Sequence, residues 1–531
     1  MRTEPSRPAA LPGTTPIGRA ERLALAAVTA GFLLVATVWA VLTPALAAPD
    51  EHAHLSSIIR VAEGGGWPDP GEARVPNAVQ AARDEAALPA ASRSTIAELE
   101  VAHPGPSDLV DQMTQHPIPF YAIGAGVYGA LGMEDWRWDH AMLALRGLCI
   151  LLVAPLPVLA WRAVRDLTGS APAALLAAAA PLAVPKLAQI TGSVNNDAVA
   201  ILTGAVVAVL AVRMLRRPAG WWAVAGLGVA VGVAGLSKGL ALALIPLAGL
   251  AVLASPAPGR WPWLRRTLRA LLLAAVAVAA GLFHWVRNYV VYGAVQPAGL
   301  VRPDYDWGSG GPDFGKLVDE LWRSLTASFW GSFDHVERPF AMWASAVCLF
   351  VILVFGLCYA DRTTRWRTVV LLSPLVGILA ILLPGIWADY TRTGLLAGMQ
   401  GRYLFGMLVP LIAASALAWR RMPPPNRRRG TMIALIAVFA VMAVDGLVHG
   451  YLAYYPFGPS GAQEWATHVP VPWPALATLL GATALVGVAA VVLLVRALPR
   501  DHDDEQGFGQ PDARMGRSES GEQSAPATPE T

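Results

Sequence analysis

Residues 23–54 read LALAAVTAGFLLVATVWAVLTPALAAPDEHAH, a long apolar run that ends in two carboxylates and two histidines. Its apolar part is long enough for a helix to cross a bilayer, which takes about 20 residues. Similar runs recur along the 531-residue chain, in which 55% of residues are hydrophobic and 15% are charged. The mean hydropathy is +0.47. A soluble chain of this length needs more charge, so the sequence predicts an all-α polytopic membrane protein.

The apolar runs predict about twelve transmembrane helices. They lie near residues 23–46, 141–162, 172–190, 197–215, 221–235, 238–256, 269–288, 339–360, 367–387, 403–419, 431–454 and 473–496. The first run is longer than the apolar core of a signal peptide, so we favour an uncleaved first helix. With or without cleavage, the chain that follows it is expected outside.

Arginines occupy every second short connection between these runs, near residues 162–165, 213–217, 260–269, 362–367 and 420–429. Basic loops favour the cytoplasmic side, so these connections are predicted to face inward. The same rule predicts a multi-pass inner-membrane protein with a cytoplasmic N-terminal segment 1–22 and a disordered cytoplasmic tail 499–531. The alternation requires that the short, Gly- and Pro-containing stretch 117–132 be re-entrant or interfacial. The transmembrane domain is then 23–498, with long outer loops near 47–140 and 289–338.

The first candidate for chemistry is the pair Asp50-Glu51, followed by His52 and His54, where the first helix leaves the membrane. Adjacent carboxylates can act as a general base, and a carboxylate with an imidazole can hold a divalent metal ion. An ordinary cluster of interfacial charges explains the same residues equally well.

Three further outer-side candidates follow along the chain. His116 precedes two prolines and Tyr121, although a single loop histidine often has no partner. Asn196 and Asp197 begin a predicted helix, where helix capping is the more favoured explanation. Lys238 lies in a turn between apolar runs, where a cation is costly unless it is paired, and a phosphate is a natural partner. A lysine that extends to the interface is the alternative.

The last candidates are Arg287-Asn288 and Arg402-Tyr403, at predicted outer helix ends. A guanidinium matches a phosphate with two hydrogen bonds, and both arginines oppose the usual inward bias of positive charge. Interfacial arginines that reach the headgroups are the alternative. The placement of all these groups on one side predicts a base or metal site beside a phosphate clamp.

Motifs for soluble nucleotides are absent from the sequence: it has no GxxxxGK[ST] loop and no GxGxxG after a strand. We expect no nucleic-acid partner. An outer-facing enzyme would need a donor that crosses the membrane, such as a polyprenyl-phosphate carrier.

In this order the motifs resemble those of GT-C polyprenyl-phosphate-dependent glycosyltransferases, the group of protein mannosyltransferases and aminoarabinose transferases. The chain looks closest to uncharacterised bacterial members. The resemblance covers about residues 20–420. It is carried by Pro49-Asp50-Glu51 with His54, His116-Pro117 with Tyr121, Asn196-Asp197, Lys238, Trp285-Val286-Arg287-Asn288 with Tyr292-Gly293, and Gln400-Gly401-Arg402-Tyr403-Leu404. In place of a second proline after His116-Pro117 this chain has Ile118, and it lacks the large soluble C-terminal domain of some relatives.

The resemblance implies inverting transfer of a sugar from a polyprenyl-phosphate donor to a cell-envelope glycan, lipid or protein at the outer face. It implies Asp50 and Glu51 as the catalytic residues, with Asp50 the first choice for the base. Glu51 and His54 would position the reacting groups or serve as tentative ligands of a divalent metal ion. Lys238, Arg287 and Arg402 would hold the donor phosphate. The remaining substrate-binding residues would be His116, Tyr121, Asn196, Asp197, Asn288 and Tyr403.

Two alternatives remain open at this point: a transporter or flippase for a lipid-linked glycan, and a non-catalytic assembly partner. A transporter typically has polar residues near the membrane midplane and repeat symmetry. This sequence shows mainly positive-inside arginines on its inner side, which favours the enzyme.

Overall fold

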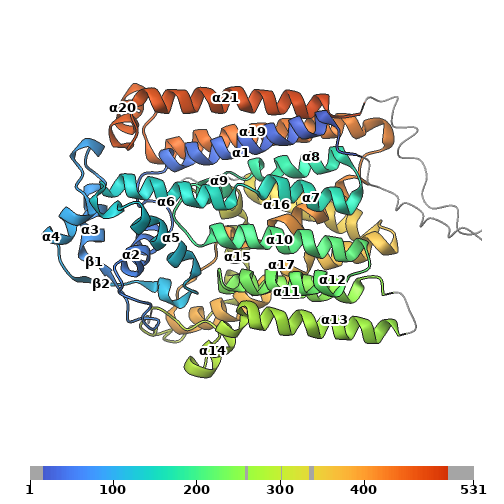
Figure 1. The fold of residues 1–531 in the computed structure, drawn as a ribbon, viewed down its shortest axis with the longest axis horizontal. Helices are drawn as coiled ribbons and strands as arrows, with labels where there is room; N and C mark the ends of the chain where they lie inside the picture. The colour runs from blue at the N-terminus through green and yellow to red at the C-terminus, as the bar shows by residue number, and fades with distance from the viewer. Residues whose placement is uncertain (1–15, 258–260, 301, 334–339, 500–531) are drawn as a thin grey trace, which may run out of the picture.

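The structure is a bundle of helices with a small cap of short elements at one end (Figure 1). It is a computed structural model that describes residues 16–257, 261–300, 302–333 and 340–499. The predicted N-terminal segment lies outside the described residues up to residue 15, and the predicted tail lies outside them from residue 500.

The elements follow one another along the chain in this order: α1 (Arg19–Leu42), α2 (Glu51–Ala62), β1 (Arg74–Pro76), α3 (Asn77–Glu85), η1 (Ala90–Ser92), α4 (Ile96–Ala102), β2 (Pro106–Val110), η2 (Gln112–Gln115), α5 (Pro119–Ala130), η3 (Met133–Asp135), α6 (Trp138–Val153), α7 (Leu156–Thr168), α8 (Ala171–Ala179), η4 (Ala180–Ala183), α9 (Pro185–Thr191), α10 (Asp197–Arg216), α11 (Trp221–Gly235), η5 (Gly239–Leu244), α12 (Ile245–Ala254), α13 (Pro262–Ala277), η6 (Val278–Leu282), α14 (Phe283–Tyr292), α15 (Phe314–Trp330), α16 (Phe340–Val351), η7 (Ile352–Cys358), α17 (Arg362–Thr393), η8 (Gly401–Met407), α18 (Leu408–Trp419), η9 (Pro425–Arg427), α19 (Arg428–Tyr454), α20 (Pro459–His468) and α21 (Trp473–Arg496).

The bundle is that of an all-α multi-pass membrane protein. Among the described residues, eight helices are long and apolar enough to cross a membrane. A ninth span results if Ala171–Ala183 and Pro185–Thr191, which meet at a bend of 72°, are counted together. The other three predicted segments coincide with shorter apolar helices, at Trp221–Gly235, Gly239–Ala254 and Met342–Cys358. The prediction of twelve spans is therefore not confirmed, although every predicted segment is helical.

The cap consists of the segment between α1 and α6, and we call this end of the bundle the loop end (Figure 1). Its strands β1 and β2 pair antiparallel, with Arg74 opposite Val110. The 12-residue helix α5 occupies the stretch 117–132 and packs against α2. Gly124 permits this contact, since a Cβ there would lie 2.8 Å from the Ile58 side chain.

Several predicted basic connections meet at the opposite end of the bundle. Arg165 pairs with Glu21 at 3.0 Å, and Arg213 pairs with Asp166 at 3.1 Å. These pairs place the start of α1 beside the ends of α7 and α10. The connections therefore lie at the end away from the cap, as the alternation of arginines predicts, whereas the side of the membrane that each end faces remains a prediction.

Two tightly wound segments, η5 and η8, bring backbone to the loop end of α10. α10 contacts both of them, and a Cβ on Gly204 of α10 would overlap the carbonyl of Gly406 in η8. This close approach needs glycine. The first residue of α10, Asp197, thus lies near both the start of η5 and the start of η8.

Candidate active site

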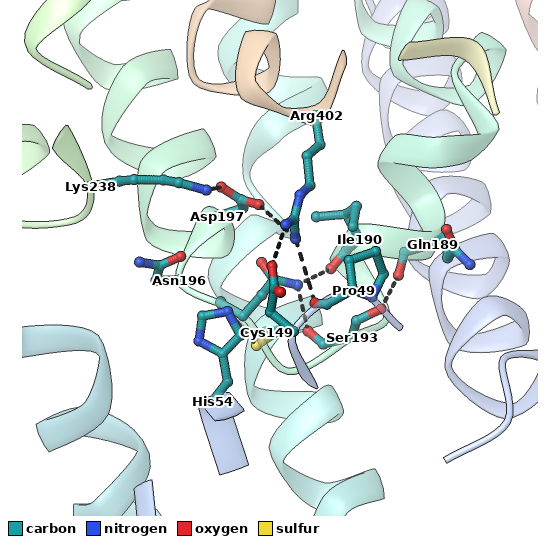
Figure 2. Close-up of polar contacts among 12 residues, drawn as sticks. Pro49, His54, Cys149, Gln189, Ile190, Ser193, Asn196, Asp197, Lys238 and Arg402 are labelled. Carbon is teal, nitrogen blue, oxygen red and sulfur yellow. Dashed lines mark hydrogen bonds and ion pairs between the residues drawn. The ribbon is translucent and has the colours of Figure 1, made fainter. Parts of the chain in front are cut away.

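A cluster of two carboxylates and two cations lies at the loop end of α10. Arg402 pairs with Asp50 at 2.5 Å and lies 3.8 Å from Asp197. Lys238 pairs with Asp197 at 2.8 Å. Figure 2 shows Lys238 and Arg402 pointing toward Asp197 from different elements. The structure thus joins four of the residues that the sequence singles out into one network.

Each member of the cluster occupies the beginning of an element. Asp50 precedes α2 with a left-handed backbone, φ 60°. Asp197 is the first residue of α10, Lys238 precedes η5, and Arg402 is the second residue of η8. The N-terminal end of a helix favours negative charge, which suits Asp197 at its position.

Asp50 is the member of the cluster that a substrate can reach, because its side chain is 33% exposed while that of Arg402 is 4% exposed. Burial raises the pKa of Asp50. The charge of Arg402, the hydrogen bond from Arg402 and the charge of Lys238 outweigh burial, so the pKa lies below its ordinary value. Gln112 also lies within 3.5 Å of the carboxylate. Asp50 is therefore an ionised, partly exposed carboxylate at neutral pH.

Glu51 has different surroundings from its neighbour. Its side chain is fully buried and accepts from Nε and Nη2 of Arg146 at 2.8 and 2.7 Å. It also accepts from the backbone N–H of Val194 at 2.9 Å. Arg146 donates in addition to the carbonyls of Ala40 and Thr43 at the end of α1. These bonds fix the turn that carries Asp50 to the turn that precedes Asp197, which gives Glu51 a positioning role.

His54 and Tyr121 lie beside the cluster. Their side chains hydrogen-bond at 3.1 Å and their rings stack at 5.8 Å. Burial lowers the pKa of His54 to about 3. His116 is also buried, and burial together with the charge of Lys238 lowers its pKa to about 3. Both imidazoles are neutral at physiological pH, and Nδ1 of His116 has no hydrogen-bond partner.

Asn196 and Tyr403 line the cluster from two sides. The Asn196 amide donates to the carbonyl of Ser237 at 3.3 Å, next to Lys238. The Tyr403 ring lies 4.9 Å from Nζ of Lys238 and 5.8 Å from Cζ of Arg402. Asn196 therefore supports the Lys238 turn, and Tyr403 packs between the two cations.

Arg287 and Asn288 lie apart from the four-residue cluster in the described contacts. Arg287 is exposed and its guanidinium lies 5.7 Å from the Tyr292 ring. Asn288 is buried and donates to the carbonyl of Val295 at 3.3 Å. The connection is indirect, since Trp285 of the same helix donates to the carbonyl of Gly235, shortly before Lys238.

The two tentative metal ligands, Glu51 and His54, have other partners in the structure. Among the described residues no group of three or more His, Cys, Asp or Glu side chains could hold a metal ion. Both oxygens of Glu51 are taken by Arg146, and Nδ1 of His54 is taken by the Tyr121 hydroxyl. With these contacts in place, the Glu51 carboxylate is not available to bind a metal ion.

Sequence reasoning missed Arg146, the partner of Glu51, and Gln112, which lies beside Asp50. Arg146 carries a signal that could have identified it, since it is a charge inside the apolar run of α6 and such residues need a partner. Gln112 lies in an irregular polar loop and has no comparable signal.

One comparison with known proteins agrees with the predicted resemblance. Residues 138–285, which are part of the chain, match the model of the family described as dolichyl-phosphate-mannose-protein mannosyltransferase. The matched segment includes Asp197 and Lys238.

Two solved structures of ArnT from Cupriavidus metallidurans are similar to this chain. The one bound to undecaprenyl phosphate is 18% identical, with a TM-score of 0.42, over 88% of this chain and 76% of that chain. The apo structure is 17% identical, with a TM-score of 0.42, over 86% of this chain and 73% of that chain. The comparison with curated proteins finds no match.

Proposed function

Starting from the GT-C glycosyltransferase match, we propose that this chain transfers a sugar from a polyprenyl-phosphate donor to an acceptor at the outer face of the cytoplasmic membrane. The observation that carries the proposal is the network of Asp50, Arg402, Asp197 and Lys238. It combines a partly exposed carboxylate with two cations, the groups that a base and a phosphate clamp require.

The mixed lining of a small neighbouring cavity supports a lipid-linked donor. Its lining residues include the polar or charged Lys238, Arg402 and Tyr403 and the apolar Leu240, Leu244 and Met407. A ligand with a phosphate head and a hydrocarbon chain matches this mixture. The family description names dolichyl-phosphate mannose, a sugar on such a carrier.

In the proposed reaction Asp50 accepts the proton of the acceptor hydroxyl as the hydroxyl attacks the sugar carbon. The bond between that carbon and the phosphate oxygen breaks, and its electron pair goes to the phosphate. Arg402 and Lys238 stabilise the negative charge that develops there. A donor phosphate would compete with Asp50 for Arg402, and loss of that ion pair makes the carboxylate a stronger base.

The charge pattern supports the outer location. The cluster lies at the loop end, and several arginine-rich connections lie at the other end. If the positive-inside bias holds, the loop end faces outward. An acceptor from the cell envelope, whether glycan, lipid or protein, would be within reach there.

The proposal is tested with the full chain reconstituted in lipid vesicles and supplied with radiolabelled polyprenyl-phosphate mannose and polyprenyl-phosphate aminoarabinose in separate assays. We expect release or transfer of one labelled sugar by the wild-type chain. This activity should fall at least a hundredfold in Arg402→Gln and Lys238→Gln.

Arg427→Gln, at the opposite end of the bundle, is the matched control and should keep the wild-type rate. Movement of the intact lipid across the bilayer without sugar release would instead establish a flippase. A chelator added to the same assay tests the metal ion that the resemblance implies.

A further inference from the structure

Lys186 is a buried lysine that has no role in the proposed reaction as described so far for Asp50, Arg402 and Lys238. It lies on α9, in the bent apolar helix pair, and is 8% exposed. Its Nζ donates to the carbonyl of Ser332 at 3.0 Å and lies 5.6 Å from the Phe333 ring. Among the described residues no carboxylate pairs with it, although charges inside a membrane bundle normally have a counter-ion.

Arg402 lies on η8, which packs against helix α9, the helix that carries Lys186. Arg402 is 4% exposed, and its Nε has no hydrogen-bond partner even though the other nitrogens bind Asp50 and the carbonyl of Pro49. Two buried basic side chains on packed elements, with donor capacity left on both, are an arrangement that suits the binding of an anion.

The charges of the cluster also indicate that a bound phosphate needs another cation. Lys238 and Arg402 are already matched by Asp197 and Asp50, one carboxylate for each cation. Glu51 is neutralised by Arg146. His54 and His116 are neutral at physiological pH.

A donor phosphodiester adds one negative charge to this neutral set. After the sugar leaves, the phosphate carries about −1.5 to −2. One more cation is therefore needed to balance the phosphate in the bound state.

We propose that Lys186 and Arg402 together bind the phosphate of the lipid-linked donor, with Lys186 as the third cation of the site. The inference rests on the proposed function and adds a binding residue to it. The phosphate retains the electron pair of the broken sugar–oxygen bond, the acceptor oxygen forms the new bond to the sugar, and Asp50 takes the acceptor proton. Lys186 then stabilises the additional charge on the departing phosphate.

The test measures binding of polyprenyl phosphate, without any sugar, to the full chain in lipid nanodiscs, with neutral polyprenol as the reference ligand. Lys186→Gln should weaken polyprenyl-phosphate binding at least tenfold, as expected for the loss of a buried charge-assisted hydrogen bond. Lys186→Arg should stay within threefold of wild type. Lys316→Gln, which removes an exposed lysine of α15, should have no effect.

Two further ligands identify the source of the phosphate. Inorganic phosphate and phosphatidylglycerol should compete poorly with polyprenyl phosphate. If either competes as well as the polyprenyl lipid, the site is a general anion site and the assignment to the donor is overturned.

Wild-type affinity for polyprenyl phosphate in Lys186→Gln would overturn the inference. An equal loss of affinity in Lys186→Gln and Lys186→Arg, together with a lowered melting temperature, would also overturn it. That result would indicate that Lys186 has a structural role through its contact with Ser332. These outcomes leave the proposed function standing when Lys238→Gln still loses binding. If the wild-type chain does not distinguish polyprenyl phosphate from polyprenol, the proposed function fails together with the inference.

Discussion

Arg402 donates to Asp50 across 2.5 Å, although 352 residues separate them in the chain. Asp50 lies in the turn after the first long helix, and Arg402 begins the late segment η8. Their ion pair closes the site between the first and last thirds of the bundle. It also keeps Asp50 ionised, because Arg402 is the main charge that lowers the pKa of this carboxyl against the effect of burial.

Asp50→Asn should abolish most of the sugar transfer while the fold is kept. Asparagine tolerates the left-handed backbone that Asp50 adopts, so the substitution removes charge and basicity without adding strain. Loss of a general base typically lowers kcat by about 10²–10⁴-fold. The rate of transfer from the lipid-linked donor measures it, with donor binding measured separately.

Asp108→Asn is the matched control, because Asp108 is an exposed aspartate of the same cap on β2. It should transfer sugar at the wild-type rate. A wild-type kcat in Asp50→Asn would remove Asp50 from the mechanism.

Glu51→Gln should mainly reduce stability. The Glu51–Arg146 pair has side chains that are 0% and 4% exposed, and removal of one partner leaves the other charge buried. Such a loss typically costs about 3–5 kcal/mol. Thermal unfolding of the purified chain in lipid should show a lower Tm for Glu51→Gln than for Asp50→Asn.

The double variant Glu51→Gln with Arg146→Met is the control for the predicted loss of stability. It should unfold at a higher temperature than Glu51→Gln alone, because no uncompensated charge remains. Full stability in Glu51→Gln would contradict the positioning role.

The sequence predicts the helices well because their apolar runs are long and continuous. It predicts less about their shape. The 72° bend between Ala171–Ala183 and Pro185–Thr191 depends on local backbone geometry, and so does the π-helical segment Val278–Leu282 that precedes α14. These irregularities determine where Lys186 and Arg287 lie, so neither position could be derived from a hydropathy pattern.

The candidate site could be predicted as a set of residues but not as a network. Asp50, Asp197, Lys238 and Arg402 are recognisable because charges flanking apolar runs are costly. Their spacing in the sequence does not show that Arg402 pairs with Asp50, or that Glu51 pairs with Arg146. The sequence alone does not distinguish the adjacent carboxylates of Asp50 and Glu51. In the structure the left-handed backbone at Asp50 accompanies their different orientations.

Acid should destabilise the protein through its buried histidines. In the folded state the pKa values of His54 and His116 are lowered to about 3, whereas an unfolded histidine has a pKa near 6.5. Below pH 6.5 the unfolded chain therefore binds protons that the folded chain does not, so stability falls as pH falls from about 6.5 toward 3. Each histidine contributes about 1.4 kcal/mol per pH unit well inside this window.

Melting temperatures measured between pH 7 and pH 4.5 check this expectation. The decline should be shallower in His116→Gln than in wild type. His103→Gln, which changes an exposed histidine of the same cap, should follow the wild-type curve. A slope that His116→Gln leaves unchanged would show that His116 is already charged in the folded protein.

Gly401→Ala should impair donor binding by displacing the adjacent Arg402. A Cβ at this position would overlap the backbone nitrogen of Phe329 and lie 2.5 Å from the carbonyl of Leu325, and helix backbone cannot move aside as a side chain can. The Gly401 N–H also donates to Ser328 Oγ at 2.7 Å, which ties η8 to α15. We expect KM for the donor to rise at least tenfold, with a smaller change in kcat, because the base is retained.

Gly481→Ala, where a Cβ meets nothing within 4 Å, should leave both constants unchanged. Equal constants in Gly401→Ala and wild type would mean that Arg402 does not depend on its contact with α15.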